Sequence, residues 1–382
     1  MKKRFLFLML VLSASLVFSG CDKDGGDEPA DVEDSSSNEP VISIVTDEPA
    51  VPTVDISTDT AAGSDDDEVR EGMYRSELTN EWIDEALKDQ RPIAAMVDNE
   101  KTALPHFGLS QSDIVYEMTN STANDGVTRL MVLFKDYNSV KQIGSIRSVR
   151  PTNLQIVPEW NAVICHDGGP FYIDDYMAKD YVENFSGTFS RVNNGKSREF
   201  TEYILEGDID KNFASHSKYS KTYNSYHSDE PHYKFASAGK PNDLSQYSDA
   251  KSATHIQMPY KHNKPYLDYD ESTGLYTYSE YGSTHVDAGN NNEPLTFKNL
   301  LIQNCRYVQF DANGYMMFHS IDFNRDGYYI TDGKAIPITW SKEDELSATR
   351  YYDKDGDEIV LNTGRTYVAL VPDDIWKGLE IQ

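Results

Sequence analysis

The chain has 382 residues and a formal net charge of −28, with 63 Asp and Glu against 35 Lys and Arg. A surface this acidic repels nucleic acid and anionic lipid headgroups, which excludes both as partners of the surface as a whole. A cluster of arginines is therefore more informative here than it would be in a basic protein.

Residues 1–20 have the pattern of a secretory signal peptide. The apolar run Phe5–Phe18 is too short for a permanent membrane helix, which needs about 20 residues. It ends in Ser19-Gly20-Cys21, which resembles the lipobox of bacterial lipoproteins. We expect Cys21 to carry acyl chains such as palmitate and to anchor the protein on the extracytoplasmic face of the cell membrane. Ordinary cleavage and secretion of a soluble protein is the alternative.

Residues 21–70 are predicted to form a disordered acidic tether. Between residues 22 and 68 only Lys23 is basic, and no residue is aromatic. Such a composition cannot bury a core, and its charges repel one another. The tether would hold a folded body several nanometres from the bilayer.

Residues 71–245 are predicted to form an α/β layered domain with a mixed sheet. It would begin with a short amphipathic segment at Leu78–Leu87. Short apolar runs bounded by Asn, Asp and Gly indicate buried strands at 92–98, 113–118, 129–134 and 161–166. Helices are expected at 151–157 and 171–184, and two long helix-poor connections at 186–198 and 207–250.

Residues 250–382 are predicted to form a second, mainly antiparallel β domain. Short aromatic and β-branched segments alternate there with turn signals at Asn313-Gly314, Asp332-Gly333 and Asp355-Gly356. The predicted fold class is therefore α+β, with an α/β domain followed by a mainly β domain.

Two arginines three residues apart, Arg147 and Arg150, precede Pro151. Proline disfavours helical geometry at the residue before it and suits the first position of a helix. We expect a strand-to-helix turn where both guanidiniums converge on a phosphate or carboxylate, with Arg129 from the neighbouring strand. A buried structural ion pair between Arg147 and Glu117 is the alternative.

A histidine and a glycine pair follow the last predicted strand of the first domain. His166, Asp167, Gly168 and Gly169 stand where open α/β sheets place ligand sites. The other histidines have no zinc spacing and are expected at the surface, so we predict no metal and no cofactor. Cys165 and Cys305 lie in apolar segments and are expected to be buried free thiols.

Several segments are similar to the YerB-type lipoprotein family, which carries the domain name DUF3048. They include RPIAAMVDN, GVTRLMVLF, IGSIRSVRP and HDGG in the first half, and GYYITDGKAIPITW in the second, in the family's order over about 74–373. The resemblance implies a two-part, lipid-anchored extracytoplasmic protein and no particular reaction. It adds His216 as a candidate binding residue, although Ser215 stands where the family has proline. Asn124-Asp125-Gly126 replaces the family's Glu-Gly-Gly.

Two functions remain open at this stage. The first is a cell-envelope binding or scaffold protein whose Arg129, Arg147 and Arg150 hold an anionic ligand. That ligand would be a peptidoglycan fragment or the carboxylate of a cell-wall synthesis protein. The second is an enzyme of phosphoryl or glycosyl transfer or hydrolysis on an envelope polymer, with Glu117 or Asp167 as general base and His166 as acid.

Overall fold

The structure is a computed structural model, and it describes residues 69–237 and 239–382. The predicted signal peptide, the lipidation site Cys21 and the tether up to residue 68 lie outside these residues. Among the residues described, no helix is long and apolar enough to cross a membrane.

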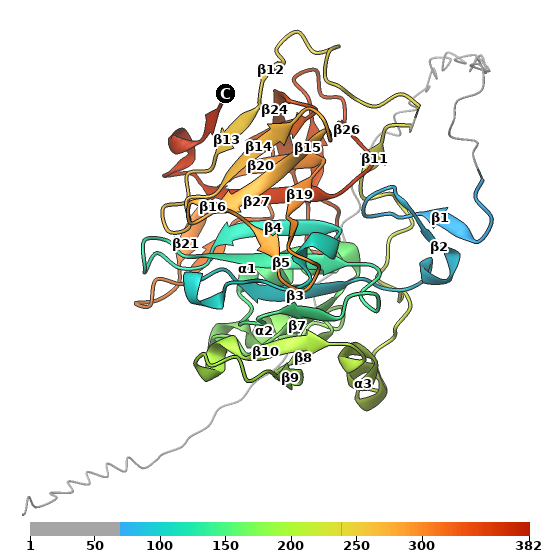
Figure 1. The fold of residues 1–382 in the computed structure, drawn as a ribbon, viewed down its shortest axis with the longest axis vertical. Helices are drawn as coiled ribbons and strands as arrows, with labels where there is room; N and C mark the ends of the chain where they lie inside the picture. Colours follow the sequence, from blue (N-terminus) through green and yellow to red (C-terminus); the bar gives the residue numbers. More distant parts are fainter. Residues whose placement is uncertain (1–68, 238) are drawn as a thin grey trace, which may run out of the picture. The chain divides into compact units, whose positions relative to one another are not determined.

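Most of the apolar strands join one mixed sheet of 11 strands (Figure 1). The order is β12-β24-β23-β20-β27-β4-β5-β3-β7-β8, and β25 pairs with β24. The strands from the first half are β3 (Ile93–Asp98), β4 (Ile114–Thr119), β5 (Thr128–Phe134), β7 (Val163–His166) and β8 (Asn184–Ser186). Those from the second half are β12 (Lys251–Ser252), β20 (Asn299–Cys305), β23 (Arg325–Thr331), β24 (Lys334–Ser341), β25 (Arg350–Tyr352) and β27 (Thr366–Pro372).

The two halves of the chain meet in the middle of this sheet. Strand β27 runs parallel to β4, from Thr366 opposite Ile114 to Leu370 opposite Met118, and parallel to β20 on its other side. Backbone hydrogen bonds therefore join the segment predicted as α/β to the segment predicted as β. The boundary near residue 250 divides the sequence without dividing the sheet (Figure 1).

The strands of this sheet send alternate side chains to two hydrophobic layers. In β5, Leu130 and Val132 pack into the first layer and Met131 into the second. The first layer includes Tyr278 from a six-stranded antiparallel sheet, and the second includes Leu154 from helix α1 (Pro151–Ile156). Successive residues on β3, β4 and β5 thus face the two layers in turn, so the position of a residue along its strand decides which layer its side chain faces.

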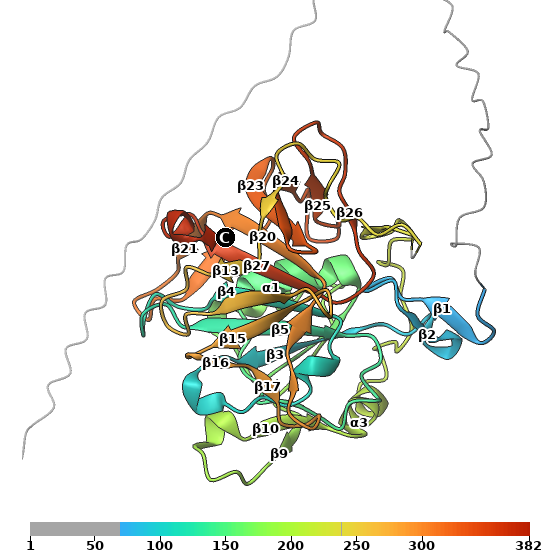
Figure 2. The ribbon, with the colours of Figure 1, turned by 45° about the horizontal axis from the view of Figure 1, so that its top comes forward.

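Two smaller sheets and short helices lie beside these layers (Figures 1 and 2). The six-stranded sheet consists of β13 (His255–Gln257), β14 (Tyr266–Asp270), β15 (Leu275–Glu280), β16 (Ser283–Thr284), β19 (Thr296–Phe297) and β28 (Glu380–Ile381). A three-stranded sheet contains β6 (Gln142–Gly144), β9 (Ser190–Arg191) and β10 (Glu202–Leu205). The α-helices are α1 (Pro151–Ile156), α2 (Asp174–Met177) and α3 (Asp208–Ser215), and β17 (Val286–Asp287) pairs with β18 (Glu293–Pro294).

The α+β fold class is confirmed, and so are the four buried strands. Two helix predictions need correction. The helix expected at 171–184 is only one short turn of 3-10 helix followed by α2, because Lys179 onward leads into β8. The connection at 207–250 begins with α3, which buries Ile209 and Phe213. Cys165 and Cys305 are buried and unpaired, as expected.

Candidate functional site

Arg129, Arg147 and Arg150 lie in one cluster, in which Arg129 and Arg147 share the carboxylate of Asp98 and Arg150 lies beside them. The Nε atom of Arg147 lies 2.6 Å from Oδ2 of Asp98, and NH2 of Arg129 lies 3.8 Å from the same oxygen. The guanidinium of Arg150 stacks on the ring of Tyr315, 4.0 Å from its centroid. The structure therefore brings together the three arginines that the sequence singles out.

The backbone explains how these side chains meet. Asp98 ends β3 and is the cross-strand neighbour of Arg129 near the start of β5, so both face the second hydrophobic layer. The Arg147 amide donates to Met96 on β3, at 2.8 Å. Arg150 is the extended N-cap residue of α1, which begins at Pro151, so the predicted strand-to-helix turn is confirmed.

The charges in this cluster do not balance. Arg147 also pairs with Glu199, which is about half exposed, at 2.9 Å. Arg150 has no acidic partner among residues 69–237 and 239–382, and only 6% of its surface is exposed. Burial and the neighbouring Arg129 lower the pKa of Arg150 to about 10. The Nε atoms of Arg129 and Arg150 are buried without a hydrogen-bond partner in the described part of the chain. The cluster is therefore short of negative charge.

The loop after β7 lies against the arginine segment. The Val149 amide donates to Gly168 O at 3.1 Å, and Ser148 Oγ donates to Asp167 O at 2.9 Å. Gly168 has a φ of +71°, and a Cβ on Gly169 would lie 2.3 Å from Ile173. Gly168 is thus favoured by its positive φ, and Gly169 by its close packing against Ile173 and Val149.

The side chains of His166 and Asp167, beside that loop, are already bonded to other protein groups. Nδ1 of His166 donates to Gly168 O at 2.8 Å, and burial lowers the pKa of His166. The carboxylate of Asp167 lies 2.8 Å from NH2 of Arg191, which also pairs with Glu202. His166 and Asp167 are therefore near the cluster but bound elsewhere.

An exposed aromatic patch adjoins Arg150, and the sequence reasoning missed it. Phe171 is 84% exposed and Phe310 40% exposed. Tyr172 stacks on Phe310 with centroids 4.6 Å apart, and its hydroxyl is buried without a partner. The Tyr172 hydroxyl is close enough to Arg150 to affect its pKa. Phe171 directly follows the Gly-Gly-Pro turn, which is the only sequence signal that an aromatic side chain is displayed there.

Glu117 lies on the other face of the sheet from the arginine cluster. Glu117 is two residues after Val115 on β4, so it faces the same first hydrophobic layer. Its carboxylate accepts hydrogen bonds from Tyr367 Oη at 2.7 Å and from Asn263 Nδ2 at 2.7 Å. Burial and then Glu280 raise the pKa of Glu117. The alternative ion pair between Glu117 and Arg147 is wrong, because Arg147 is paired with Asp98.

His216 lies in neither the arginine cluster nor the hydrogen-bond network of Glu117. It caps the end of α3, where Nδ1 donates to Asn212 O at 2.8 Å, and its ring stacks on Tyr219. Its place in the fold is explained by packing on Phe185 and Tyr219.

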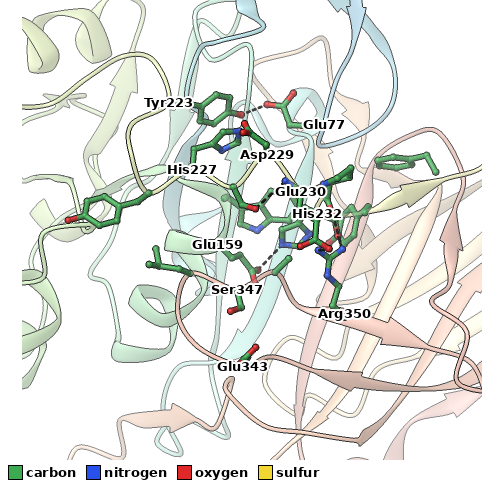
Figure 3. Close-up of a pocket in the computed structure, with 18 of the residues that line it drawn as sticks. Glu77, Glu159, Tyr223, His227, Asp229, Glu230, His232, Glu343, Ser347 and Arg350 are labelled. Carbon is green, nitrogen blue, oxygen red and sulfur yellow. Dashed lines mark hydrogen bonds and ion pairs between the residues drawn. The ribbon is translucent and has the colours of Figure 1, made fainter. Parts of the chain in front are cut away.

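A large open cleft of about 1400 Å³ lies elsewhere, and none of the predicted site residues lines it (Figure 3). Its walls carry aromatic side chains, among them Trp160 and Tyr223, and acidic ones, among them Glu77 and Glu230. An acidic and aromatic lining of this kind suits a cationic ligand.

The floor of this cleft contains a buried polar group. His232 stacks on Trp160 with centroids 3.5 Å apart. Its Nε2 lies 3.5 Å from Oε1 of Glu159 (Figure 3). Burial alone would raise the pKa of Glu159, but Lys342 and His232 bring it well below its usual range. Glu159 is thus held as a carboxylate by Lys342, 2.7 Å away.

The expectation of surface histidines is wrong for His106, His232 and His285, which are all at least nine-tenths buried. The sequence contains no spacing signal for them, because each is buried by contacts between segments far apart in the chain.

The chain was compared with known proteins. Residues 78–255 match the family described as "Protein of unknown function (DUF3048) N-terminal domain", and residues 256–368 match its C-terminal domain. A curated relative from Bacillus subtilis (strain 168), named "Putative lipoprotein YerB", is 23% identical over 315 residues, or 78% of this chain and 86% of the relative. The crystal structure of the YerB protein from Bacillus subtilis superposes with a TM-score of 0.67 at 19% identity, covering 81% of this chain and 99% of that one. The chain therefore belongs to the DUF3048 family, as its sequence motifs predict.

Proposed function

We propose that this protein is a lipid-anchored, extracytoplasmic binding protein of the cell envelope that holds an anionic ligand at Arg129, Arg147 and Arg150. The observation that carries the proposal is Arg150, a buried cation without an acidic partner in the described residues. The relative named as a lipoprotein supports the anchor at Cys21. The ligand would be a peptidoglycan fragment, an envelope phosphate, or a carboxylate of a cell-wall synthesis protein.

A buried charge is costly unless an opposite charge or several hydrogen bonds compensate it. Asp98 compensates Arg147 and partly Arg129, which leaves Arg150 dependent on the stacking with Tyr315 and one bond to Val149 O. A phosphate or carboxylate would supply the missing charge and accept from the free Nε atoms. The side chain of Arg147 is 25% exposed and gives such a ligand access from solvent.

The patch of Phe171, Tyr172 and Phe310 beside the cluster supports a ligand with an apolar or ring-shaped part. Exposed aromatic side chains next to a charged group are typical of recognition surfaces. The patch combines one loop from each half of the chain, since Phe171 precedes α2 and Phe310 follows β21 (Tyr307–Gln309). Both halves would then be needed for binding.

The alternative of phosphoryl or glycosyl chemistry has less support. Glu117 faces the opposite layer, and both His166 and Asp167 are engaged by neighbouring groups. A general base must reach the reacting group in a plausible substrate position, and none of these carboxylates is free beside the arginines.

The test is ligand binding by the full chain in detergent micelles, with inorganic phosphate, a muropeptide and a polyprenyl phosphate as probes. We expect one probe to raise the melting temperature by mass action. Arg150→Gln should weaken its binding roughly tenfold or more, as for a lost charged hydrogen bond. This variant should stay folded, because no buried carboxylate among residues 69–237 and 239–382 pairs with Arg150.

The control is Arg306→Gln, which removes a half-exposed arginine paired with Asp322. It should bind like wild type. The absence of any shift with all three probes, or an equal loss in both variants, would contradict the proposal.

A further inference from the structure

Three side chains that can ligate a metal meet in the interior, on the side of the sheet away from the arginines. His106, Glu280 and His285 are 0%, 3% and 4% exposed, and one potential ligand atom from each lies within 4.8 Å of the others. His106 precedes β4, Glu280 ends β15, and His285 lies between β16 and β17. The cluster therefore joins the two halves of the chain.

Each histidine has one ring nitrogen bonded to a protein oxygen and one without a partner. Nε2 of His106 lies 2.6 Å from Asp98 O, and Nδ1 of His285 lies 2.9 Å from Oε1 of Glu280. Nδ1 of His106 and Nε2 of His285 are buried and have no hydrogen-bond partner in the described chain. Histidines that bind metals almost always donate their other N–H to a carbonyl or carboxylate, which fixes the tautomer. Nδ1 of His106 therefore carries a free lone pair.

The surroundings are rich in acceptors and poor in cations. Glu280 and Glu117 are both buried and share Asn263, whose Nδ2 lies 3.1 Å and 2.7 Å from them. Neither carboxylate has a lysine or arginine partner among the described residues. Hydrogen bonds from neutral donors satisfy both carboxylates, whereas the Oδ1 atom of Asn263 is a buried acceptor without a donor in the described chain. Buried acceptors without donors cost free energy unless water or a cation fills the gap.

We propose that His106, Glu280 and His285 bind one zinc ion. Two imidazoles and one carboxylate are a recurrent ligand set for zinc, whereas magnesium and calcium prefer oxygen ligands alone. Ligands about 2.0–2.2 Å from a tetrahedral zinc are roughly 3.4 Å apart. The three ligand atoms lie within 4.8 Å of one another, so zinc binding would draw them closer by up to about 1.4 Å. No cysteine is required for this set.

The ion would fasten the loop after β3 to the hairpin after β15. Those segments already meet there: Ala288 N donates to His106 O at 3.0 Å, and Gly108 N donates to Oδ1 of Asp287 at 2.9 Å. A site whose three side chains are buried fits a structural ion that is taken up during folding. The site is then a link between the two family segments and is independent of anion binding at Arg150.

The test is metal content of the full chain, purified without a histidine tag and dialysed against zinc, by elemental analysis. We expect one zinc per chain, and a melting temperature that falls when a strong chelator is added at elevated temperature. Cobalt should replace zinc and give the intense visible absorption of a tetrahedral site. Glu280→Gln and His285→Ala should lose the ion, while His255→Ala, which changes a partly exposed histidine paired with Asp268, should keep it.

If a variant fails to fold, the zinc content and the melting temperature of the wild-type protein still decide whether the site exists. Wild-type protein that retains no zinc and no cobalt, and whose melting temperature is the same with zinc and with chelator, would overturn the proposal. Ordered water would then fill the gap between the histidines.

Discussion

Asp98 holds Arg147 with its side chain and His106 with its main chain. Its Oδ2 lies 2.6 Å from Nε of Arg147, and its carbonyl oxygen accepts from Nε2 of His106 at 2.6 Å. The last residue of β3 thus connects the arginine cluster on one face of the sheet to the histidine cluster on the other. A substitution at Asp98 should remove the contact with Arg147 and keep the main-chain contact with His106.

Asp98→Ala is expected to destabilise the fold by about 3–5 kcal/mol, the usual cost of removing one partner from a buried ion pair. The carboxylate is 2% exposed, and its removal leaves Arg147 with only Glu199 and Arg129 with none. Urea unfolding followed by circular dichroism measures the change. Phosphate should restore part of the lost stability by occupying the arginine cluster.

The matched control for this prediction is Glu199→Gln. Its carboxylate pairs with the same arginine but is 49% exposed, so its loss should cost about 1 kcal/mol or less. An equal cost for both variants would mean that Asp98 is not the anchor of the cluster.

Glu117→Ala is expected to cost about 3 kcal/mol or more, because it leaves several buried donors unpaired. Tyr367 Oη and Thr128 Oγ1 donate to Glu117 at 2.7 Å and 2.8 Å. Glu117→Gln keeps one oxygen in place and should cost about 1 kcal/mol. Denaturant unfolding of both variants measures the difference. Two variants as stable as wild type would show that Glu117 does not hold the two sheets together.

The sequence predicts the elements of the arginine site better than its electrostatics. Apolar runs locate β3, β5 and β7, and Pro151 fixes the start of α1, so Arg129, Arg147 and Arg150 can be expected near one edge. The partner of Arg147 could not be predicted, because it follows from the bridge between Ile146 and Val97 of β3. The contact of Arg129 with the same carboxylate follows from the register between β3 and β5. A register slip by one residue would place Arg129 on the other face.

The buried histidines illustrate a different limit. His106 and His285 stand in segments without local metal spacing, and they meet only because the six-stranded sheet packs on the first layer of the large sheet. His232 is buried by stacking on Trp160, a contact between two loops. Such contacts depend on the tertiary arrangement and leave no periodic pattern in the chain.

Lys342→Met is expected to cost about 3–5 kcal/mol, since it strands the Glu159 carboxylate in the protein interior. Both side chains are 0% exposed, and Nζ lies 2.7 Å from Oε2. The double variant Glu159→Met, Lys342→Met should cost much less than the sum of the two single changes, and a double-mutant cycle measures this coupling. The partly exposed pair Lys179–Glu345 is the control, where Lys179→Met should cost about 1 kcal/mol or less. Additive costs at the buried pair would contradict the prediction.

The stability of the protein should fall as the pH rises through the range in which Glu202 keeps its proton in the folded state and loses it in the unfolded state. Burial, and then the carboxylate of Asp167, raises the pKa of Glu202 to about 7, while Arg191 lies beside both groups. Between about pH 4.5 and 7 the folded state holds a proton that the unfolded state has released, so this group costs stability with increasing pH. The slope is at most about 1.4 kcal/mol per pH unit.

Glu202→Gln keeps the neutral form and should remove this part of the slope, as urea unfolding at pH 5, 6, 7 and 8 would measure. Glu206→Gln, an exposed change just beyond β10, should leave the slope as in wild type. A Glu202→Gln profile parallel to wild type would mean that Glu202 is ionised throughout and that Arg191 neutralises both carboxylates.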